Sequence, residues 1–337
     1  MREVAEQAQV SVTTVSHVIN DTRPVSDELR AKVTAAMDEL GYQPNRLARS
    51  LRRGETYTIG MIIPDGVNPF FAEVARGIED TGFEQGYSVI LCNSDGNLEK
   101  ELLYTNVLNE KQVDGIIFVA GGLSQEHILG LQQRGLPVVV VDREIPGLPV
   151  GTVITDNAQG GWLATGHLLS LGHRRIACLA GPYDLTPSAE RVTGYRQALE
   201  AARVPVEEHL VLRGDFNFES GYNSIRELLA LEEPPTAVFA CSDLMAIGVI
   251  AAAAESGYRV PVDLSLVGFD DIELASYTTP ALTTVRRPKY QMGAIAARML
   301  LEHMQQDDLI PQRQILATEL VVRKSSAPVS QTEKSHV

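Results

Sequence analysis

The sequence has few of the features that mark secreted, membrane-bound or metal-binding proteins. Its 337 residues include three cysteines and one tryptophan, and no apolar run approaches the roughly 20 residues that span a bilayer. Each cysteine lies in an apolar segment without metal-ligand spacing, which indicates buried thiols in a reducing compartment. The chain opens into a polar helical pattern instead of a secretory signal. We therefore expect a cytoplasmic protein with no bound metal and no membrane partner.

Positive charge is also scarce, which limits how the protein could bind nucleic acid. Lysine and arginine total 29 against 43 aspartates and glutamates, so the net charge is −14. This balance argues against a protein that coats nucleic acid through bulk electrostatics. The acidic excess lies after residue 54, because residues 1–54 hold eight basic and seven acidic side chains. A DNA-binding segment at the start of the chain is compatible with these charges.

The first twenty residues have the pattern of two short helices joined by a tight turn. Ser11 is a suitable N-cap for the second helix, because its hydroxyl can accept from an amide of the first turn. That helix carries an inward apolar stripe, and its opposite face presents Thr13, Ser16, His17 and Asn20. Small hydrogen-bonding groups on a helix that fits a major groove are typical of a recognition helix. By itself, the pattern also fits an amphipathic helical hairpin with a polar outside.

A third helix is predicted from Ser26 to Leu40, with Ser26 as a plausible cap and Leu40 in its buried stripe. The segment that follows, 44–53, holds four arginines and no acidic residue. A helix this short is barely stable alone in water. The segment is therefore either a solvated linker or a helix that folds only when it binds a partner.

From Thr58 onward the pattern changes to short apolar strands that alternate with helices. One series runs to about residue 157, and a second begins near Ala158 and is traced to Val267. This alternation predicts two parallel-sheet domains in tandem. The last residues, 326–337, are polar, and we expect them to be disordered.

Polar side chains follow several of these strands. Asp65, Asp95, the pair Asp142-Arg143, the pair Ser242-Asp243 and the pair Asp270-Asp271 each come after an apolar run. Ligands of open α/β sheets bind beyond the carboxyl ends of the strands, so these residues should meet in a cleft between the domains. Carboxylates, arginine and aromatic rings suit a sugar. A single aspartate at a strand end is often only a helix cap.

The amino-acid sequence of the first helices resembles that of the lactose-repressor family of bacterial regulators. The pattern A-x-x-A-x-V-S-x-x-T-V-S-x-V-[IL]-N runs from Ala5 to Asn20. The core resembles periplasmic sugar-binding proteins and is most similar to ribose repressors, through N-P-F-F, D-R, E-R-x-x-G-Y, G-D-F and V-G-F-D-D. The resemblance implies an all-α helix-turn-helix headpiece followed by an α/β core of two doubly wound parallel-sheet subdomains.

The resemblance also implies a domain plan. The headpiece would span 1–43, and the hinge helix and linker 44–57. The effector-binding and dimerisation core would span 58–325, with one subdomain built from about 58–157 and 289–318 and the other from about 158–288 and 319–325. The partners implied are palindromic operator DNA, a sugar effector and a second copy of the chain. The residues expected to contact DNA are Ser11, Val12, Thr13, Thr14, Ser16, His17, Asn20, Arg23, Leu51 and Arg52.

Carried over by position, the effector site would contain Asn68, Phe70, Phe71, Asp142, Arg143, Arg191, Phe216, Ser242, Asp270 and Arg287. In the family, Leu51 would insert into the minor groove of the operator. The effector implied is ribose or a related pentose, and a purine or a phosphosugar is the alternative. The motifs at Gly194-Tyr195 and from Asp243 to Ala246 are interpreted as structural.

Three positions depart from the family pattern. Gln9 stands in a turn where glycine or asparagine is usual, and a positive φ there would cost about 1 kcal/mol. Ser242 stands where many sugar binders have asparagine. Arg287 precedes Pro288 where glutamine is common, and an additional arginine would also suit an anionic ligand.

Other classes of function fit the sequence less well. The common nucleotide-binding, serine-hydrolase, β-lactamase and zinc-protease motifs are absent, so we expect neither catalysis nor a cofactor. A sugar-binding protein that serves a transporter would require export, which the headpiece argues against. A transcriptional regulator, most simply a repressor, is therefore the prediction.

Overall fold

The computed structural model describes residues 1–20, 23–42, 55–120, 122, 125–145, 147–182, 185–305 and 312–329. The chain divides into two units, Met1–Tyr57 and Thr58–Val337. Leu51 and Arg52 lie outside the described residues. Within the described part of the chain, no helix combines the length and the apolar character needed to cross a bilayer.

Within its described residues, the first unit is a bundle of three helices, α1 (Arg2–Gln7), α2 (Val12–Asn20) and α3 (Asp27–Glu39). The predicted apolar stripes meet between them, because α1 packs against both α2 and α3. The buried side chains of this small core are Val4, Ala5, Ala8, Val15, Val33 and Ala36.

The ends of these helices test the predicted caps. Ser11 caps α2 as expected, with its Oγ accepting from the backbone N of Thr14 at 2.9 Å. Gln9 takes the left-handed conformation, with φ of 53°, that the turn requires. Ser26 stands at the N-cap of α3 but makes no side-chain capping bond. Leu40 lies outside the predicted buried stripe, because it follows the last turn of α3 and is 44% exposed.

The second unit begins with a parallel sheet whose order is β11-β5-β4-β3-β1-β2. Its strands are β1 (Thr58–Ile63), β2 (Ser88–Asn93), β3 (Gly115–Val119), β4 (Val138–Val141), β5 (Gly151–Thr155) and β11 (Arg313–Leu316). The helices of this subdomain are α5 (Pro69–Glu84), α6 (Leu98–Glu110), α7 (Gln125–Gln133) and α12 (Lys289–Gln305).

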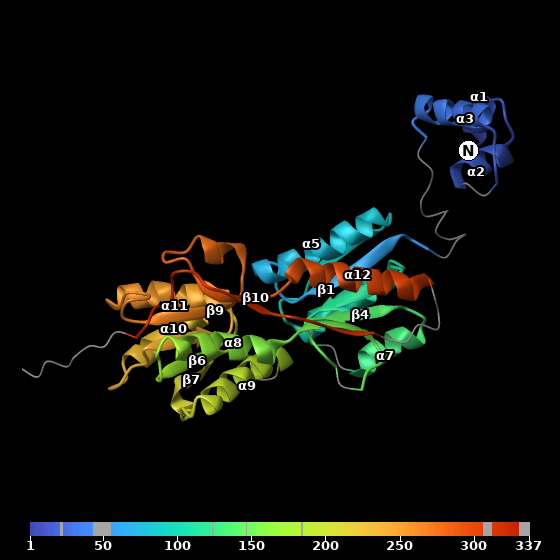
Figure 1. Ribbon diagram of the computed structural model, residues 1–337. Helices are drawn as coiled ribbons and strands as arrows, with labels where there is room; N and C mark the ends of the chain where they lie inside the picture. The colour runs from blue at the N-terminus through green and yellow to red at the C-terminus, as the bar shows by residue number, and fades with distance from the viewer. Residues whose placement is uncertain are drawn as a thin grey trace, which may run out of the picture. The chain divides into compact units, whose positions relative to one another are not determined.

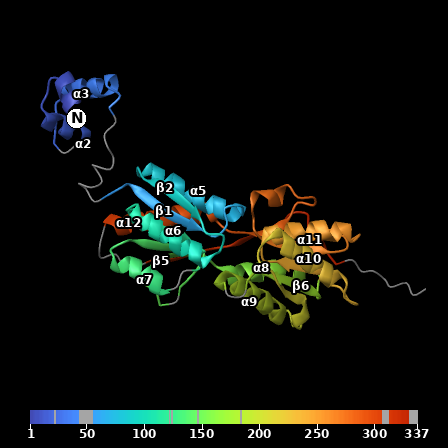
Figure 2. The same cartoon turned by 180° about the vertical axis from the view of Figure 1, so that it is seen from behind.

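Both faces of this sheet are covered, as a parallel sheet requires. Successive side chains of β1 face opposite layers: Met61 lies in the core cluster with Val74 of α5 and Met292 of α12. Ile62 lies in the other cluster with Leu108 of α6. Figures 1 and 2 show the sheet between these helices, with α5 beside α12.

The second sheet has the order β12-β10-β9-β8-β6-β7, and only β12 is antiparallel to its neighbour. Its strands are β6 (Ile176–Ala180), β7 (Val211–Arg213), β8 (Ala237–Ala240), β9 (Ser265–Asp270), β10 (Thr283–Arg286) and β12 (Glu319–Val321). Its helices, α8 (Asn157–Ser170), α9 (Thr186–Ala201), α10 (Phe218–Leu229) and α11 (Asp243–Glu255), pack as the pairs α8 with α9 and α10 with α11. Two short 3₁₀ turns, Glu208–Leu210 and Glu273–Ser276, complete it.

The helix pairs approach closely through glycine. A Cβ on Gly161 of α8 would lie 2.2 Å from the carbonyl oxygen of Arg191, and one on Gly194 of α9 would lie 2.0 Å from that of Ala158. Tyr195 follows and donates its hydroxyl to the carbonyl of Ile176 at 2.8 Å. These contacts agree with the structural role interpreted for Gly194-Tyr195.

The chain crosses between the two subdomains three times, after β5, after β10 and between β11 and β12. The helix α12 and the strand β11 therefore return to the first subdomain after the second has been traced. The predicted alternation of strands and helices is confirmed through β9. The elements β7, β10, α12, β11 and β12 were not delineated in the sequence as individual elements.

The prediction of a disordered tail from residue 326 is wrong for its first four residues. The backbone N of Ala327 donates to Ser265 Oγ at 3.0 Å, and the backbone N of Val329 donates to the carbonyl of Leu171 at 3.0 Å. The Nε2 of His173 also lies 3.0 Å from the Ala327 carbonyl oxygen. Residues 330–337 lie outside the described part of the chain.

Candidate functional site

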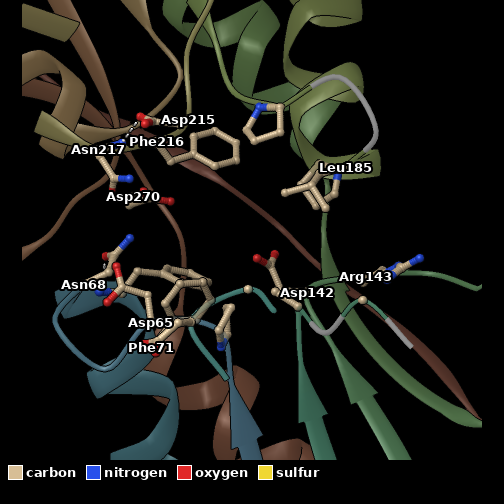
Figure 3. Close-up of a pocket in the computed structure, with 18 of the residues that line it drawn as sticks. Asp65, Asn68, Phe71, Asp142, Arg143, Leu185, Asp215, Phe216, Asn217 and Asp270 are labelled. Atoms are coloured by element: carbon tan, nitrogen blue, oxygen red, sulfur yellow. Dashed lines mark hydrogen bonds between the residues drawn. The ribbon is translucent and has the colours of Figure 1, made fainter. Parts of the chain in front are cut away.

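A cavity of about 520 Å³ lies where the carboxyl ends of the two sheets face each other. Figure 3 shows Asn68 and Phe71 of the first subdomain opposite Phe216 and Asp270 of the second. Nine of the ten residues predicted for the effector site line this cavity. They are Asn68, Phe70, Phe71, Asp142, Arg143, Arg191, Phe216, Asp270 and Arg287.

The wall of the first subdomain is built at the start of α5. Asn68 Oδ1 accepts from the backbone N of Phe70 at 3.0 Å and so begins the helix. The rings of Phe70 and Phe71 meet edge to face, with centroids 5.1 Å apart. Phe70 is buried while Phe71 is half-buried, so Phe71 supplies the aromatic surface that a ligand can reach.

The floor of the cavity is a buried group of two aspartates and two arginines. Arg287 donates to Asp142 through Nη2 and to Asp270 through Nη1, the latter at 3.2 Å. Arg191 Nη2 lies 3.8 Å from Asp270. All four residues are at most 6% exposed. Burial raises the pKa of Asp270, and the positive charges of Arg191, Arg287 and Lys289 oppose that shift.

Arg191 is fixed by the second subdomain. Its Nη1 donates to the carbonyl of Cys241 at 2.6 Å, and its Nε donates to Asn157 Oδ1 at 3.0 Å. Its guanidinium carbon lies 4.0 Å from the centroid of the Phe269 ring and 5.3 Å from that of Phe216. Burial lowers the pKa of Arg191, and the carboxylate of Asp270 opposes the shift. The Phe216 ring therefore lines the cavity beside the positive charge of Arg191.

Backbone strain is concentrated at this cavity. Ten non-glycine residues of the described chain have a positive φ, and five of them line it: Asp95, Ala120, Asp142, Phe216 and Asp270. Such conformations are costly for residues with a Cβ and are frequent at ligand sites. In Asp142 and Phe216 the strain turns the side chain at the end of a strand or loop toward the cavity (Figure 3).

Two predicted residues have roles different from those expected. Ser242 does not line the cavity: its Oγ caps α11 by accepting from Met245 N at 3.2 Å and donates to the Phe216 carbonyl at 3.1 Å. It therefore supports Phe216 from behind. Arg143 lines the cavity, but its side chain extends away from Asp142, and Arg287 is the donor that Asp142 uses (Figure 3).

Asp243, by contrast, has the structural role interpreted from the sequence. Its carboxylate is fully buried, accepts from Thr284 Oγ1 at 2.5 Å and from the backbone N of Ile272 at 2.8 Å, and does not line the cavity. Burial raises the pKa of Asp243 well above its ordinary value. It therefore joins the start of α11 to β10 and to the loop after β9.

The cavity also contains residues outside the ten predicted for the effector site. Asp65 and Asp95 follow β1 and β2, so the strand-end rule had already marked them. Glu101, buried in the first turn of α6, accepts from Gly122 N at 2.9 Å and carries no such signal. Leu185, Asp215 and Asn217 of the second subdomain also line the cavity.

The residues predicted to contact DNA gather on one helix. Ser11, Val12 and Thr13 at the start of α2 are exposed, and the Thr14 hydroxyl lies 2.8 Å from that of Ser11. Near the end of α2, Asn20 Nδ2 donates to the Ser16 carbonyl at 2.8 Å. His17 is half-buried and Arg23, in the following loop, is exposed. The exposed start of α2 thus offers the most accessible hydrogen-bonding groups of this face.

Comparisons with known proteins find matches for both parts of the chain. Residues 1–45 match the model of bacterial regulatory proteins of the lacI family, and residues 165–326 match that of a periplasmic binding protein-like domain. The chain is 40% identical to the HTH-type transcriptional repressor PurR of Photobacterium profundum, over 96% of this chain and 98% of that protein. It is 42% identical to the ribose operon repressor of Escherichia coli K12, over 97% and 99% respectively.

Two solved structures are similar along most of the core. The lac repressor dimer bound to operator and the anti-inducer ONPF aligns with a TM-score of 0.86 at 30% identity, covering 96% of this chain and 98% of that one. A lacI-family regulator from Enterococcus faecium with bound ribose aligns with a TM-score of 0.74 at 32% identity, covering 81% of this chain and all of the other.

Proposed function

The chain belongs to the lacI family of bacterial regulatory proteins and is a DNA-binding transcriptional repressor; from this premise we propose that ribose or a related neutral pentose controls its affinity for operator DNA. The observation that carries the proposal is the pair Asp142 and Asp270. These buried carboxylates reach the cavity from opposite subdomains. Sugar hydroxyls are good donors to carboxylates, and Phe71 and Phe216 offer apolar faces to a sugar ring.

The charges of the cavity favour a neutral ligand over a phosphosugar. Among the described residues, six carboxylates line it against three guanidiniums, and two of those guanidiniums, Arg191 and Arg287, already bind protein carboxylates. A phosphate group would therefore enter a site of net negative charge, which opposes it. This observation weakens the phosphosugar alternative left open by the sequence.

A purine is the second candidate effector. The ribose operon repressor and PurR are about equally similar to this chain. The Phe216 ring beside Arg191 would also accept a planar base. The Asp142 carboxylate favours the sugar, because it can accept from hydroxyl groups and ribose offers several of these around one ring.

A panel of ligands tests the assignment. We expect D-ribose to raise the melting temperature of the full chain by several degrees at a hundredfold excess over its dissociation constant. D-ribose 5-phosphate and hypoxanthine at equal concentration should leave it unchanged. A shift with hypoxanthine alone would replace the sugar with a purine, and a shift with the phosphate ester alone would contradict the charge argument.

We further propose that the protein acts in the cytoplasm as a homodimer on a palindromic operator, with one headpiece on each half-site. The contacts of Leu51 and Arg52 with operator DNA, with Leu51 in the minor groove, remain predictions from the sequence. Effector that closes the cleft would change the spacing of the two headpieces. Linkage requires that DNA then change effector affinity by the same factor, which gel shifts with and without ribose would measure.

Thr13 supplies a test of the headpiece. Replacing it with alanine is expected to cost about 1–3 kcal/mol at one base pair of the operator and to relax the preference there, because an exposed hydroxyl at the start of α2 would read a base edge. Selection from a randomised operator library measures this. Thr34→Ala, an exposed threonine of α3, is the control. If both variants select the wild-type site, Thr13 does not read the groove.

A further inference from the structure

Arg287 occupies an unusual place for an arginine. It lies at the crossover between β10 and α12, and its side chain is 1% exposed. Its three nitrogens all donate to protein oxygens: Nε to Thr155 Oγ1 at 3.0 Å, Nη1 to Asp270 at 3.2 Å, and Nη2 to Asp142. Its guanidinium carbon also lies 4.1 Å from the centroid of the Phe70 ring.

These contacts come from both subdomains. Phe70, Asp142 and Thr155 belong to the first, at the start of α5 and at the ends of β4 and β5. Asp270 ends β9 of the second. The guanidinium therefore lies in the seam between the two sheets and binds one carboxylate of each.

The surrounding charges show what Arg287 balances. Asp142 and Asp270 face Arg287 and Arg191, so the buried group has two negative and two positive charges. Lys289 donates to the backbone carbonyls of Asp270 and Asp271 and lies 3.4 Å from Glu73. Two further acidic neighbours are bound elsewhere: Asp271 pairs with Arg286 and Arg323, and Asp243 binds Thr284 and Ile272.

We propose that Arg287 is a positioning residue: an internal counter-ion that holds the carboxylates of Asp142 and Asp270 side by side across the seam, ready to accept hydrogen bonds from an uncharged ligand. It acts through the two aspartates, since its own nitrogens are engaged by the protein. The ligand part of this inference rests on the proposed sugar effector, whereas the counter-ion part does not.

The inference predicts a specific pH dependence when the charge is removed. In Arg287→Gln two buried carboxylates would face a single remaining guanidinium, so one of them would take up a proton. Asp270, whose pKa burial already raises, is the group expected to gain it. A folded-state pKa above the unfolded value means that the folded state binds the additional proton. Stability is then present at low pH and is lost as the pH rises through the folded-state pKa.

Thermal unfolding of the full chain without ligand, from pH 5 to pH 8, tests the counter-ion. We expect Arg287→Gln to melt about 5 °C below wild type at pH 8 and to recover at least half of this deficit at pH 5. Arg298→Gln is the matched control: it is the same substitution on an exposed side chain of α12, and its difference from wild type should not change with pH.

Two further variants separate charge from packing. Arg287→Lys keeps the charge but not the fork of donors, so its deficit should be independent of pH. The double variant Asp142→Asn with Arg287→Gln removes one carboxylate with the guanidinium, and the pH dependence should vanish. If Arg287→Gln follows the wild-type pH profile, or the double variant keeps the pH dependence, the counter-ion role is wrong.

Calorimetric titration with D-ribose at pH 6 and pH 8 tests the ligand part. Wild type and Arg298→Gln should bind alike at both values, whereas Arg287→Gln should bind at least tenfold more weakly at either. Equal affinity of Arg287→Gln and wild type would overturn the positioning role. If wild type does not bind ribose, the sugar proposal fails, and the unfolding series still decides whether Arg287 is the counter-ion.

Discussion

Replacing Asp142 with alanine is expected to weaken binding of the sugar effector by roughly 30- to 1000-fold, or about 2–4 kcal/mol. Asp142 is buried at the end of β4, its positive φ turns it into the cavity, and Arg287 holds its carboxylate. Truncation removes an acceptor for ligand hydroxyls and leaves the donors of Arg287 with one carboxylate instead of two. Such losses exceed the strength of a single exposed hydrogen bond, because the abandoned groups stay buried.

Asp156→Ala supplies the control for this prediction. Asp156 also follows a strand of the same sheet, but it is exposed and caps α8, with Oδ1 accepting from Gln159 N at 2.9 Å. Its loss should cost about 1 kcal/mol of stability and leave effector affinity unchanged. Operator binding without effector should be near wild type in both variants. Unchanged sugar affinity in Asp142→Ala, measured by calorimetry, would make Asp142 a structural residue and favour the purine.

Gly161→Ala is expected to lower the free energy of unfolding by roughly 3 kcal/mol or more, because a Cβ there would lie 2.2 Å from the backbone oxygen of Arg191. Backbone cannot rotate aside as a side chain can, so α9 must move away from α8. Arg191 would move with α9, and effector binding should weaken together with stability. Urea unfolding and calorimetric titration measure the two effects.

The opposite sign is expected five residues later in the same helix. Gly166 has no heavy atom within 4 Å of the position of a Cβ. Gly166→Ala should therefore stabilise the protein by about 0.5–1 kcal/mol, because alanine restricts the unfolded chain and favours the helix. If both substitutions destabilise equally, the cost reflects α8 in general and the close approach of α8 to α9 is not its cause.

The sequence predicted the site where local rules apply. Apolar runs followed by polar residues identify strand ends, and ligands of such sheets bind beyond those ends, so Asp142 and Asp270 of the two sheets could both be assigned to the cleft between the domains without coordinates. The N-cap at Ser11 and the strained turn at Gln9 also follow from local rules, which involve only a few neighbouring residues.

The rest depended on contacts between distant parts of the chain. Arg287 could be recognised as unusual from the sequence. Its partner Asp142 lies 145 positions away, and no sequence pattern reveals that this carboxylate offsets the positive charge that would otherwise suit an anionic ligand. Ser242 shows the same limit. The sequence predicts its place near the cavity, but its hydroxyl turns away from the cavity and caps α11. The short strands β7, β11 and β12 have three or four residues each and are held by neighbours rather than by their own pattern.

The interleaved path of the chain also fixes the order in which the protein can be completed on the ribosome. The strands β1 to β5 emerge early, but α12, which covers them with Met292 and Leu300, and the edge strand β11 come only after β10. At roughly 5–20 residues per second, an incomplete sheet waits on the order of ten seconds with apolar surface uncovered. Nascent chains are most vulnerable to aggregation or to chaperone capture in this interval. A premature stop codon before Lys289 would therefore leave neither half of the core finished, rather than one intact subdomain.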